Sequence, residues 1–142
     1  MVVTESTARV DVFQEIFNII NSNKLSGWSV LATFPEQTPV FPCVIVHPAE
    51  VSNNIRSFDR SERTNMGGVE IELIGKASSG MVKIDEGKDN IIDTLRNSSN
   101  ISTLKTAKID IVDIDDLGTT QERFRDLKIN TGGLRVNLEL LV

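Results

Sequence analysis

Few side chains in this 142-residue chain could do chemistry. His47 is its one histidine and Cys43 its one cysteine, so a multi-histidine metal site is excluded and the pair is two ligands short of a structural zinc site. Their i, i+4 spacing on a strand would place both side chains on one face, but about 13 Å apart at the usual strand rise. We therefore expect His47 to be a structural residue at a strand end and Cys43 to be a small core residue.

Carboxylates are densest in one short segment, at Asp110, Asp113, Asp115 and Asp116. Hard cations need several oxygens converging on one loop, and the last three aspartates could begin such a loop. The segment lacks the glutamate at the twelfth position that an EF-hand requires. We expect a solvated strand end and turn at this place instead of a metal site.

Two glycine pairs, Gly67-Gly68 and Gly132-Gly133, are the remaining candidates for a ligand loop. A phosphate loop opens a helix, because the helix N-terminus supplies the N–H groups that hold the anion. Both pairs adjoin expected strands instead. The sequence therefore predicts no nucleotide site, no catalytic residue, no metal and no cofactor.

Two polar segments are locally basic, and their cations are Arg56, Arg60 and Arg63 in the first and Arg123, Arg125 and Lys128 in the second. One interpretation is solvated loop charge, balanced by nearby acids at Asp59, Glu62, Glu122 and Asp126. The other is an electrostatic contact with a partner protein, or with DNA that passes through a channel. Repetition around an oligomer would strengthen such a contact. The residues alone leave both interpretations open.

Composition bounds the class of protein. Hydrophobic residues make up 39% and charged residues 25% of the chain, which is ordinary for one globular domain, here 1–142. A net charge of −5 argues against a dedicated binder of duplex DNA. The single cysteine fits a reducing compartment, and neither a signal peptide nor a membrane span is recognisable. We expect a soluble cytosolic protein.

The first half of the chain predicts a helix, two strands and the start of a hairpin. Apolar residues recur at helical spacing over 7–22, and an apolar segment over 28–34 is expected to be a strand. A proline-containing loop at 35–39 leads into a buried strand over 41–48, rich in β-branched residues and bounded by prolines. The region 50–75 then predicts a long hairpin with a tip within 59–68 and an alternating return strand from Val69.

The second half predicts one helix and two or three strands. Helical spacing of isoleucines and leucines indicates a helix over 81–97, which 97–100 should end. Alternation then predicts a strand over 107–114, a turn at 115–118, a short strand near 124–129, a turn or glycine bulge at 130–133 and a final strand from Leu134. The order α-β-β-β-β-α-β-β favours a single α+β domain, with a mainly antiparallel sheet and two helices packed on one face.

This pattern resembles the tail terminator proteins of long-tailed bacterial and archaeal viruses, also described as tail completion or tail-to-head joining proteins. Five features carry the resemblance: the opening amphipathic helix, the proline-flanked strand Phe41-Pro42-Cys43-Val44-Ile45-Val46, the hairpin ending Val69-Glu70-Ile71-Glu72-Leu73-Ile74-Gly75, the second helix with Ile91-Ile92-x-x-Leu95, and the closing strand Leu134-Arg135-Val136-Asn137-Leu138. They cover nearly the whole chain, as patterns of hydrophobicity.

The resemblance implies a structural virion protein in the tail or neck, assembled in the host cytoplasm, and not an enzyme. Members form hexameric rings that cap the tail tube, end its polymerisation and join the head connector. Tube protein, head-completion protein and passing DNA, without sequence-specific binding, are then the partners, and no membrane is involved. We expect contacts with the tube or a neighbouring subunit at Arg56, Phe58, Arg60, Arg63, Arg123 and Arg125.

Two other functions stay open on the sequence. One is a different neck or tail-tube component of the same virion, which would share the ring but bind other partners. The second is a cytosolic α+β binding module or small enzyme, for which a monomer or dimer with a ligand pocket would be expected.

Overall fold

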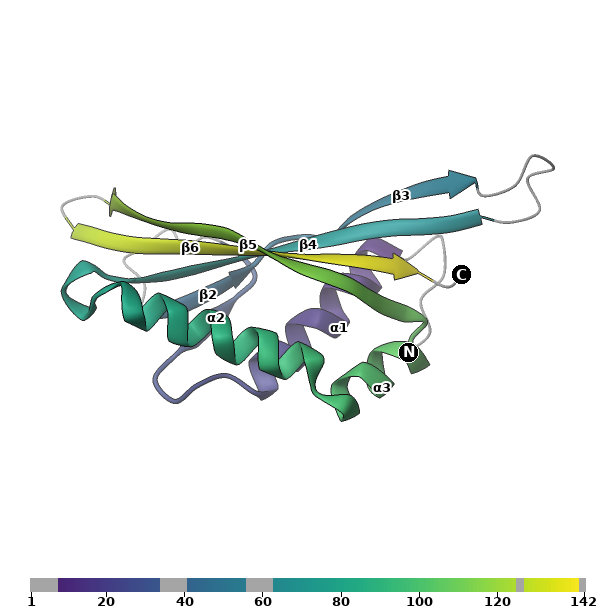
Figure 1. Ribbon diagram of the computed structural model, residues 1–142, viewed down its shortest axis with the longest axis horizontal. Coiled ribbons are helices and arrows are strands. Elements are labelled where there is room, and N and C mark those ends of the chain that lie inside the picture. Colours follow the sequence, from purple (N-terminus) through teal and green to yellow (C-terminus); the bar gives the residue numbers. More distant parts are fainter. Residues whose placement is uncertain (1–7, 34–40, 56–62, 125–126, 141–142) are drawn as a thin grey trace.

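The computed structural model describes residues 8–33, 41–55, 63–124 and 127–140, and it confirms the predicted α+β class and element order (Figure 1). The elements are α1 (Ala8–Ser22), β1 (Ser29–Leu31), β2 (Cys43–Val46), β3 (Glu50–Ile55), β4 (Arg63–Lys76), η1 (Ala77–Ser79), α2 (Met81–Arg96), α3 (Ser98–Thr106), β5 (Ile109–Phe124) and β6 (Leu127–Leu140). No described helix is both long and apolar enough to cross a bilayer.

One sheet contains all six described strands, in the order β1-β2-β4-β6-β5, with β3 also paired to β4. The β1–β2 pair is parallel and the other pairs are antiparallel. Along one side of β4, β2 pairs with 71–74 and β3 with 63–68, so the two strands follow each other along the same partner. Their junction includes Pro48, which cannot donate a ladder hydrogen bond.

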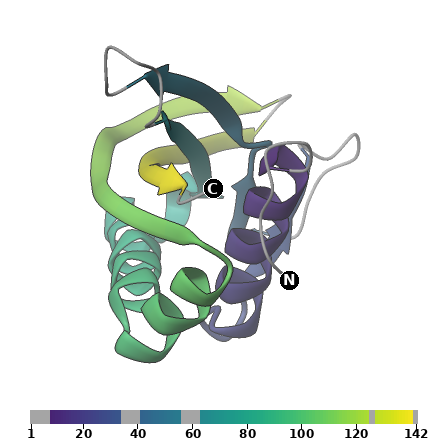
Figure 2. The same cartoon turned by 90° about the vertical axis from the view of Figure 1, so that its right-hand side faces the viewer.

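The three helices cover one face of the sheet, which curves over them (Figures 1 and 2). Alternate residues of β6 face this layer: Leu134, Val136, Leu138 and Leu140 are buried, in one core with Val69, Ile71 and Leu73 of β4 and the apolar side of α1 and α2. The opposite face, called here the helix-free face, carries the intervening residues of the same strands. Period-two alternation thus separates the main aliphatic core from a face that is polar around Arg135. A second, smaller apolar cluster is buried on this face and consists of Cys43, Ile45, Ile74 and Ile129.

The predicted turn at 115–118 is wrong, and of the two alternatives predicted at 130–133, a turn or a glycine bulge, the turn is wrong, because β5 and β6 are continuous strands. The expected turn at 115–118 lies inside β5, at a bulge between Asp116 and Thr119 where Gly118 has a φ of 93°. The expected turn at 130–133 lies inside β6. There Gly132 leaves room for α2, since a Cβ at this position would lie 2.5 Å from Ile84 Cγ2. A bulge and a close helix contact, rather than chain reversal, explain these glycines.

The sequence also gave no sign of α3. Asn97 ends α2 as predicted, but its Oδ1 then accepts a hydrogen bond from the Ser99 backbone N–H at 3.0 Å and caps a second helix. The predicted strands 28–34 and 41–48 are shorter, at Ser29–Leu31 and Cys43–Val46. The hairpin over 50–75 is confirmed, although β4 already begins at Arg63, inside the predicted tip.

Candidate functional site

The centre of the helix-free face carries an ion-paired cluster, called here the Arg135 cluster. The Arg135 guanidinium donates from Nη1 to Glu70 Oε1 and from Nη2 to Glu50 Oε2, both at 3.3 Å. Its Nε donates to Asn137 Oδ1 at 3.2 Å. Gly68 makes this packing possible, because a Cβ there would lie 2.6 Å from Arg135 Nη2.

Two further carboxylates complete the Arg135 cluster through Asn137. The Asn137 Nδ2 donates to Asp113 Oδ1 and to Asp115 Oδ2, both from β5. Cross-strand pairing sets this geometry, since Asp113 lies opposite Asn137 and Asp115 lies opposite Arg135. Four carboxylates therefore surround one cation, and this part of the surface is negatively charged.

Next to the Arg135 cluster the surface forms an open groove of about 420 Å³. Its walls include Glu50, Met66, Gly67, Val112, Asp113 and Arg135. Val112 is 52% exposed there, although it is apolar. The groove therefore combines an apolar wall with acidic rims, a surface that suits a partner offering an apolar side chain between cations.

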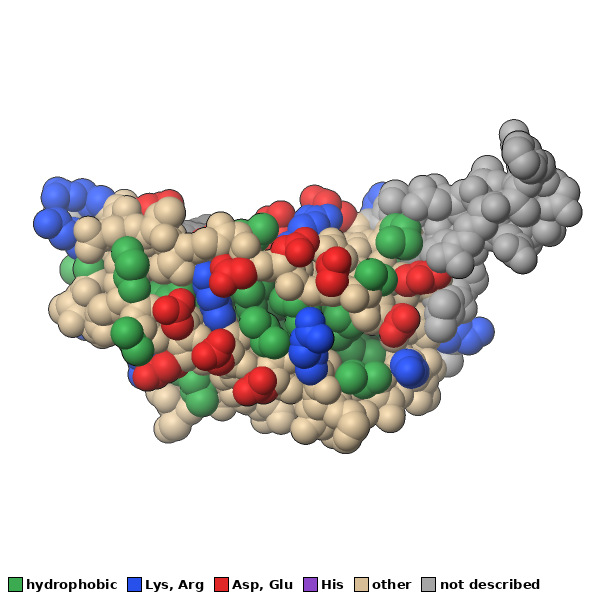
Figure 3. Space-filling model, viewed as in Figure 1, with side chains coloured by type: hydrophobic (Ala, Val, Ile, Leu, Met, Phe, Trp, Pro, Cys, Tyr) green, Lys and Arg blue, Asp and Glu red, His purple; other side chains and the backbone are tan. Residues whose placement is uncertain are grey.

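The basic residues of the second segment lie at the end of the β5–β6 hairpin. Arg123 pairs directly with Lys128, and both side chains are exposed. Glu122 pairs with Ile129, the next position, and so belongs to the opposite face of the sheet. Figure 3 shows lysine and arginine side chains gathered at this end of the molecule. Arg125 lies outside the described residues.

The first basic segment belongs to the other hairpin. Ile55 pairs with Arg63 at the last described pair of β3 and β4, while Arg56, Phe58 and Arg60 lie outside the described residues. The two hairpins end on opposite sides of the molecule, because the start of β4 pairs with the end of β6 and the start of β6 pairs with the end of β4. Among the described contact residues, Arg63 at the start of β4 and Arg123 near the end of β5 therefore lie toward opposite ends of the sheet, and Figure 1 shows the start of β4 far from the end of β5.

A buried lysine fixes the second bulge of β5 to the helix layer. Lys88 of α2 is only 3% exposed, and its Nζ donates to Asp116 Oδ1 at 2.7 Å, Thr119 Oγ1 at 2.9 Å and the Gly118 carbonyl at 3.0 Å. The Lys88 hydrogen bond, followed by one from the Gly118 backbone N–H, lowers the pKa of Asp116. Sequence reasoning missed this contact, because 28 residues separate Lys88 from Asp116.

The residues first considered for chemistry have structural surroundings. The His47 backbone N–H donates to the Glu70 carbonyl at 2.9 Å and so extends the ladder beyond β2. Cys43 is fully buried, and burial, followed by the nearby Glu72 carboxylate, raises the pKa of its thiol to about 11. Within the described ranges, no three His, Cys, Asp or Glu side chains gather where they could hold a metal ion.

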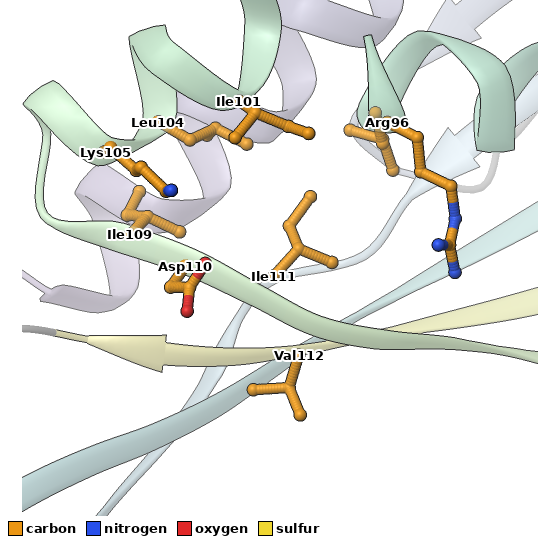
Figure 4. Close-up of a pocket in the computed structure, with 9 residues that line it drawn as sticks. Arg96, Ile101, Leu104, Lys105, Ile109, Asp110, Ile111 and Val112 are labelled. Carbon is orange, nitrogen blue, oxygen red and sulfur yellow. The ribbon is translucent and has the colours of Figure 1, made fainter. Parts of the chain in front are cut away.

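A second hollow, of about 250 Å³, lies between α3 and β5 (Figure 4). Ile101 and Leu104 of α3 point toward Ile111 of β5, and Arg96 stands to one side of them. The described lining is aliphatic with charged rims and contains neither histidine nor cysteine. Such a hollow can bind an apolar group but offers no nucleophile of those types.

Comparisons with known proteins give remote structural similarity alone. No family model matches the chain, and no curated protein matches it. Among solved structures, it is similar to a chain of a structure described as "Virion of native gene transfer agent (GTA) particle", with 12% identity, coverage of 90% of this chain and 91% of that chain, and a TM-score of 0.37. A likeness of this extent carries no argument about fold or function.

Proposed function

We propose that this chain is a structural virion protein, a tail terminator that forms a ring on the end of the tail tube, stops its polymerisation and joins it to the head connector. The sequence resemblance described above supplies the family expectation. In such a ring DNA would pass through the lumen without being read, so the net negative charge of the chain is no obstacle.

The observation that carries this proposal is the placement of unlike surfaces on one elongated sheet. The hairpins β3–β4 and β5–β6 end on opposite sides of the molecule, and the acidic Arg135 cluster lies between those ends. A ring needs a heterologous contact, in which a surface of one subunit meets a different surface of the next. A subunit with a basic end at the β5–β6 hairpin and an acidic surface elsewhere on the sheet has what such a contact requires.

The hollow between α3 and β5 favours a second candidate, a binding module for a small apolar ligand. Its volume of about 250 Å³ is below the usual range of drug-sized ligand pockets, roughly 300–1,000 Å³. Two exposed cations, Arg96 and Lys105, lie on its lining, so an amphipathic anion would be the ligand class. A monomer that binds a fatty acid at this hollow would support the module.

Native mass by light scattering, followed by electron microscopy of the same peak, tests the proposed function. We expect a closed ring of about six subunits, or a monomer that closes on addition of the virus's purified tail-tube protein. A closed ring that also shortens tube growth in a polymerisation assay distinguishes a terminator from another neck or tube component. A monomer that neither binds the tube nor limits its length would refute the proposal.

A further inference from the structure

We propose that the end of the β5–β6 hairpin of one copy docks into the acidic groove of the next copy. The hairpin end consists of Arg123, Leu127 and Lys128, and the groove is the open one beside the Arg135 cluster. This inference rests on the proposed function and deepens it, because it names the two surfaces through which neighbouring subunits would meet.

The hairpin end offers a pair of cations on one face of the hairpin and an exposed apolar side chain at the neighbouring position, on the other face. Leu127 is 40% exposed, and the exposed Arg123 and Lys128 form the cross-strand pair next to it. Two like charges placed directly opposite each other are unfavourable in an isolated hairpin, and a neighbouring carboxylate would relieve that repulsion.

The groove offers the complementary pattern. Val112 and Met66 supply apolar wall, and Glu50 and Asp113 stand on the rim. Glu50 is 76% exposed even though it pairs with Arg135, so its carboxylate still has room for another cation. The two cations of the hairpin end, Arg123 and Lys128, would match the acidic rim of the groove in charge.

The two surfaces cannot meet within one molecule. Lys128 and Asn137 belong to the same strand, nine positions apart, which corresponds to about 30 Å along β6. A contact between them is therefore intermolecular and heterologous, and successive contacts either close into a ring or continue as a filament. The Lys88 hydrogen bonds hold β5 to α2 just before the hairpin end, so the direction of that end is fixed relative to the groove.

Reciprocal charge reversal tests the contact. The tip variant carries Arg123→Glu and Lys128→Glu, the groove variant carries Glu50→Lys and Asp113→Lys, and a third protein carries all four changes. The matched control reverses two exposed lysines of the helix side, Lys24→Glu and Lys105→Glu, and has the same net charge as the tip variant. Circular dichroism and thermal unfolding verify folding, and sedimentation velocity over a concentration series gives the dissociation constant.

We expect the tip and groove variants each to weaken self-association on the order of tenfold or more, the fourfold variant to regain most of it, and the control to match the unaltered protein. Unaltered association of the tip variant would overturn the inference while leaving a ring-forming function standing. Failure of the fourfold variant to recover, or equal weakening in the control, would also overturn it. If the unaltered protein does not self-associate, the same series is run on the purified tube. Ring closure by the tip variant, or equal loss of closure in the control, would then overturn the contact, and absence of tube binding by the unaltered protein would refute the proposed function.

Discussion

Replacing Lys88 by methionine removes the ammonium that holds the second bulge of β5. Methionine keeps an unbranched apolar stem of similar length, so the packing of the Lys88 stem over Gly132 is largely retained. The change therefore isolates the three hydrogen bonds to Asp116, Gly118 and Thr119. We expect Lys88→Met to fold but to be less stable.

The size of this loss follows from how unequally the partners are buried. Breaking a fully buried ion pair costs about 3–5 kcal/mol, because the remaining charge is left without solvent. Here the Asp116 side chain is 60% exposed, so water can replace the lysine around it. The loss reduces to the charge-assisted hydrogen bonds, and we estimate about 2 kcal/mol in the free energy of unfolding. That corresponds to a decrease of about 6 °C in Tm for a domain of this size.

Urea unfolding at pH 7, with Lys83→Met as the matched control on the same helix, measures this loss. The Lys83 ammonium lies 4.0 Å from Glu86 on the surface, and we expect its removal to change stability by less than about 0.5 kcal/mol. Equal effects of the two substitutions would refute the role given to Lys88.

Because the pKa of Asp116 is lowered in the folded protein, the contribution of Asp116 to stability is present above about pH 4 and is lost as the pH falls through its folded pKa. The difference between Lys88→Met and the unaltered protein should therefore shrink in acid.

Three other predictions concern the core and the first hairpin. Gly87→Ala should lower the free energy of unfolding by about 1 kcal/mol although alanine favours helices, because the added Cβ would lie 2.6 Å from Trp28 Cη2. Urea unfolding followed by tryptophan fluorescence measures this loss, and a variant more stable than the unaltered protein would contradict the prediction. The thiol of Cys43, buried and with its pKa raised to about 11, should react with a thiol reagent at pH 8 only as fast as the protein opens, and rapid labelling of the folded protein would disprove this. Joint replacement of Arg56, Arg60 and Arg63 should leave the circular dichroism spectrum unchanged but impair tube capping. Normal tail-length control and head joining in this variant would count against a contact at the first hairpin.

The elements predicted correctly are those in which one periodicity runs without interruption. Helix α1 has a regular apolar stripe, and β4 and the end of β6 alternate strictly, so 3.6- and 2-residue periods identify them directly. Helix α2 was recognised despite Gly87, because its isoleucines keep their spacing. In these segments each buried side chain packs against the neighbouring layer, and the pattern needs no knowledge of a distant partner.

The elements that sequence reasoning missed depend on distant partners. Strand β5 changes the face to which its odd residues point at the bulge between Ile111 and Asp113, so alternation breaks although the strand continues. Helix α3 has one buried residue, Leu104, and thus almost no apolar stripe to recognise. The Arg135 cluster is equally hidden, because β3, β4, β5 and β6 each contribute part of it. The sequence shows which short segments carry charged residues, but the cross-strand register decides which charged side chains contact one another.

The bulges of β5 also bear on which part of the sheet is available for assembly. As the outermost strand beside β6, β5 would be the natural place for a second copy to add a strand. Pairing of that kind needs a regular ladder, and the two bulges leave only 113–116 regular between them. Three of those four residues are aspartates, so two such edges would repel each other, and Lys88 prevents the second bulge from straightening. The middle of the β5 edge is therefore protected against adding a strand, which favours the hairpin end and the acidic groove as contact surfaces on this side of the molecule.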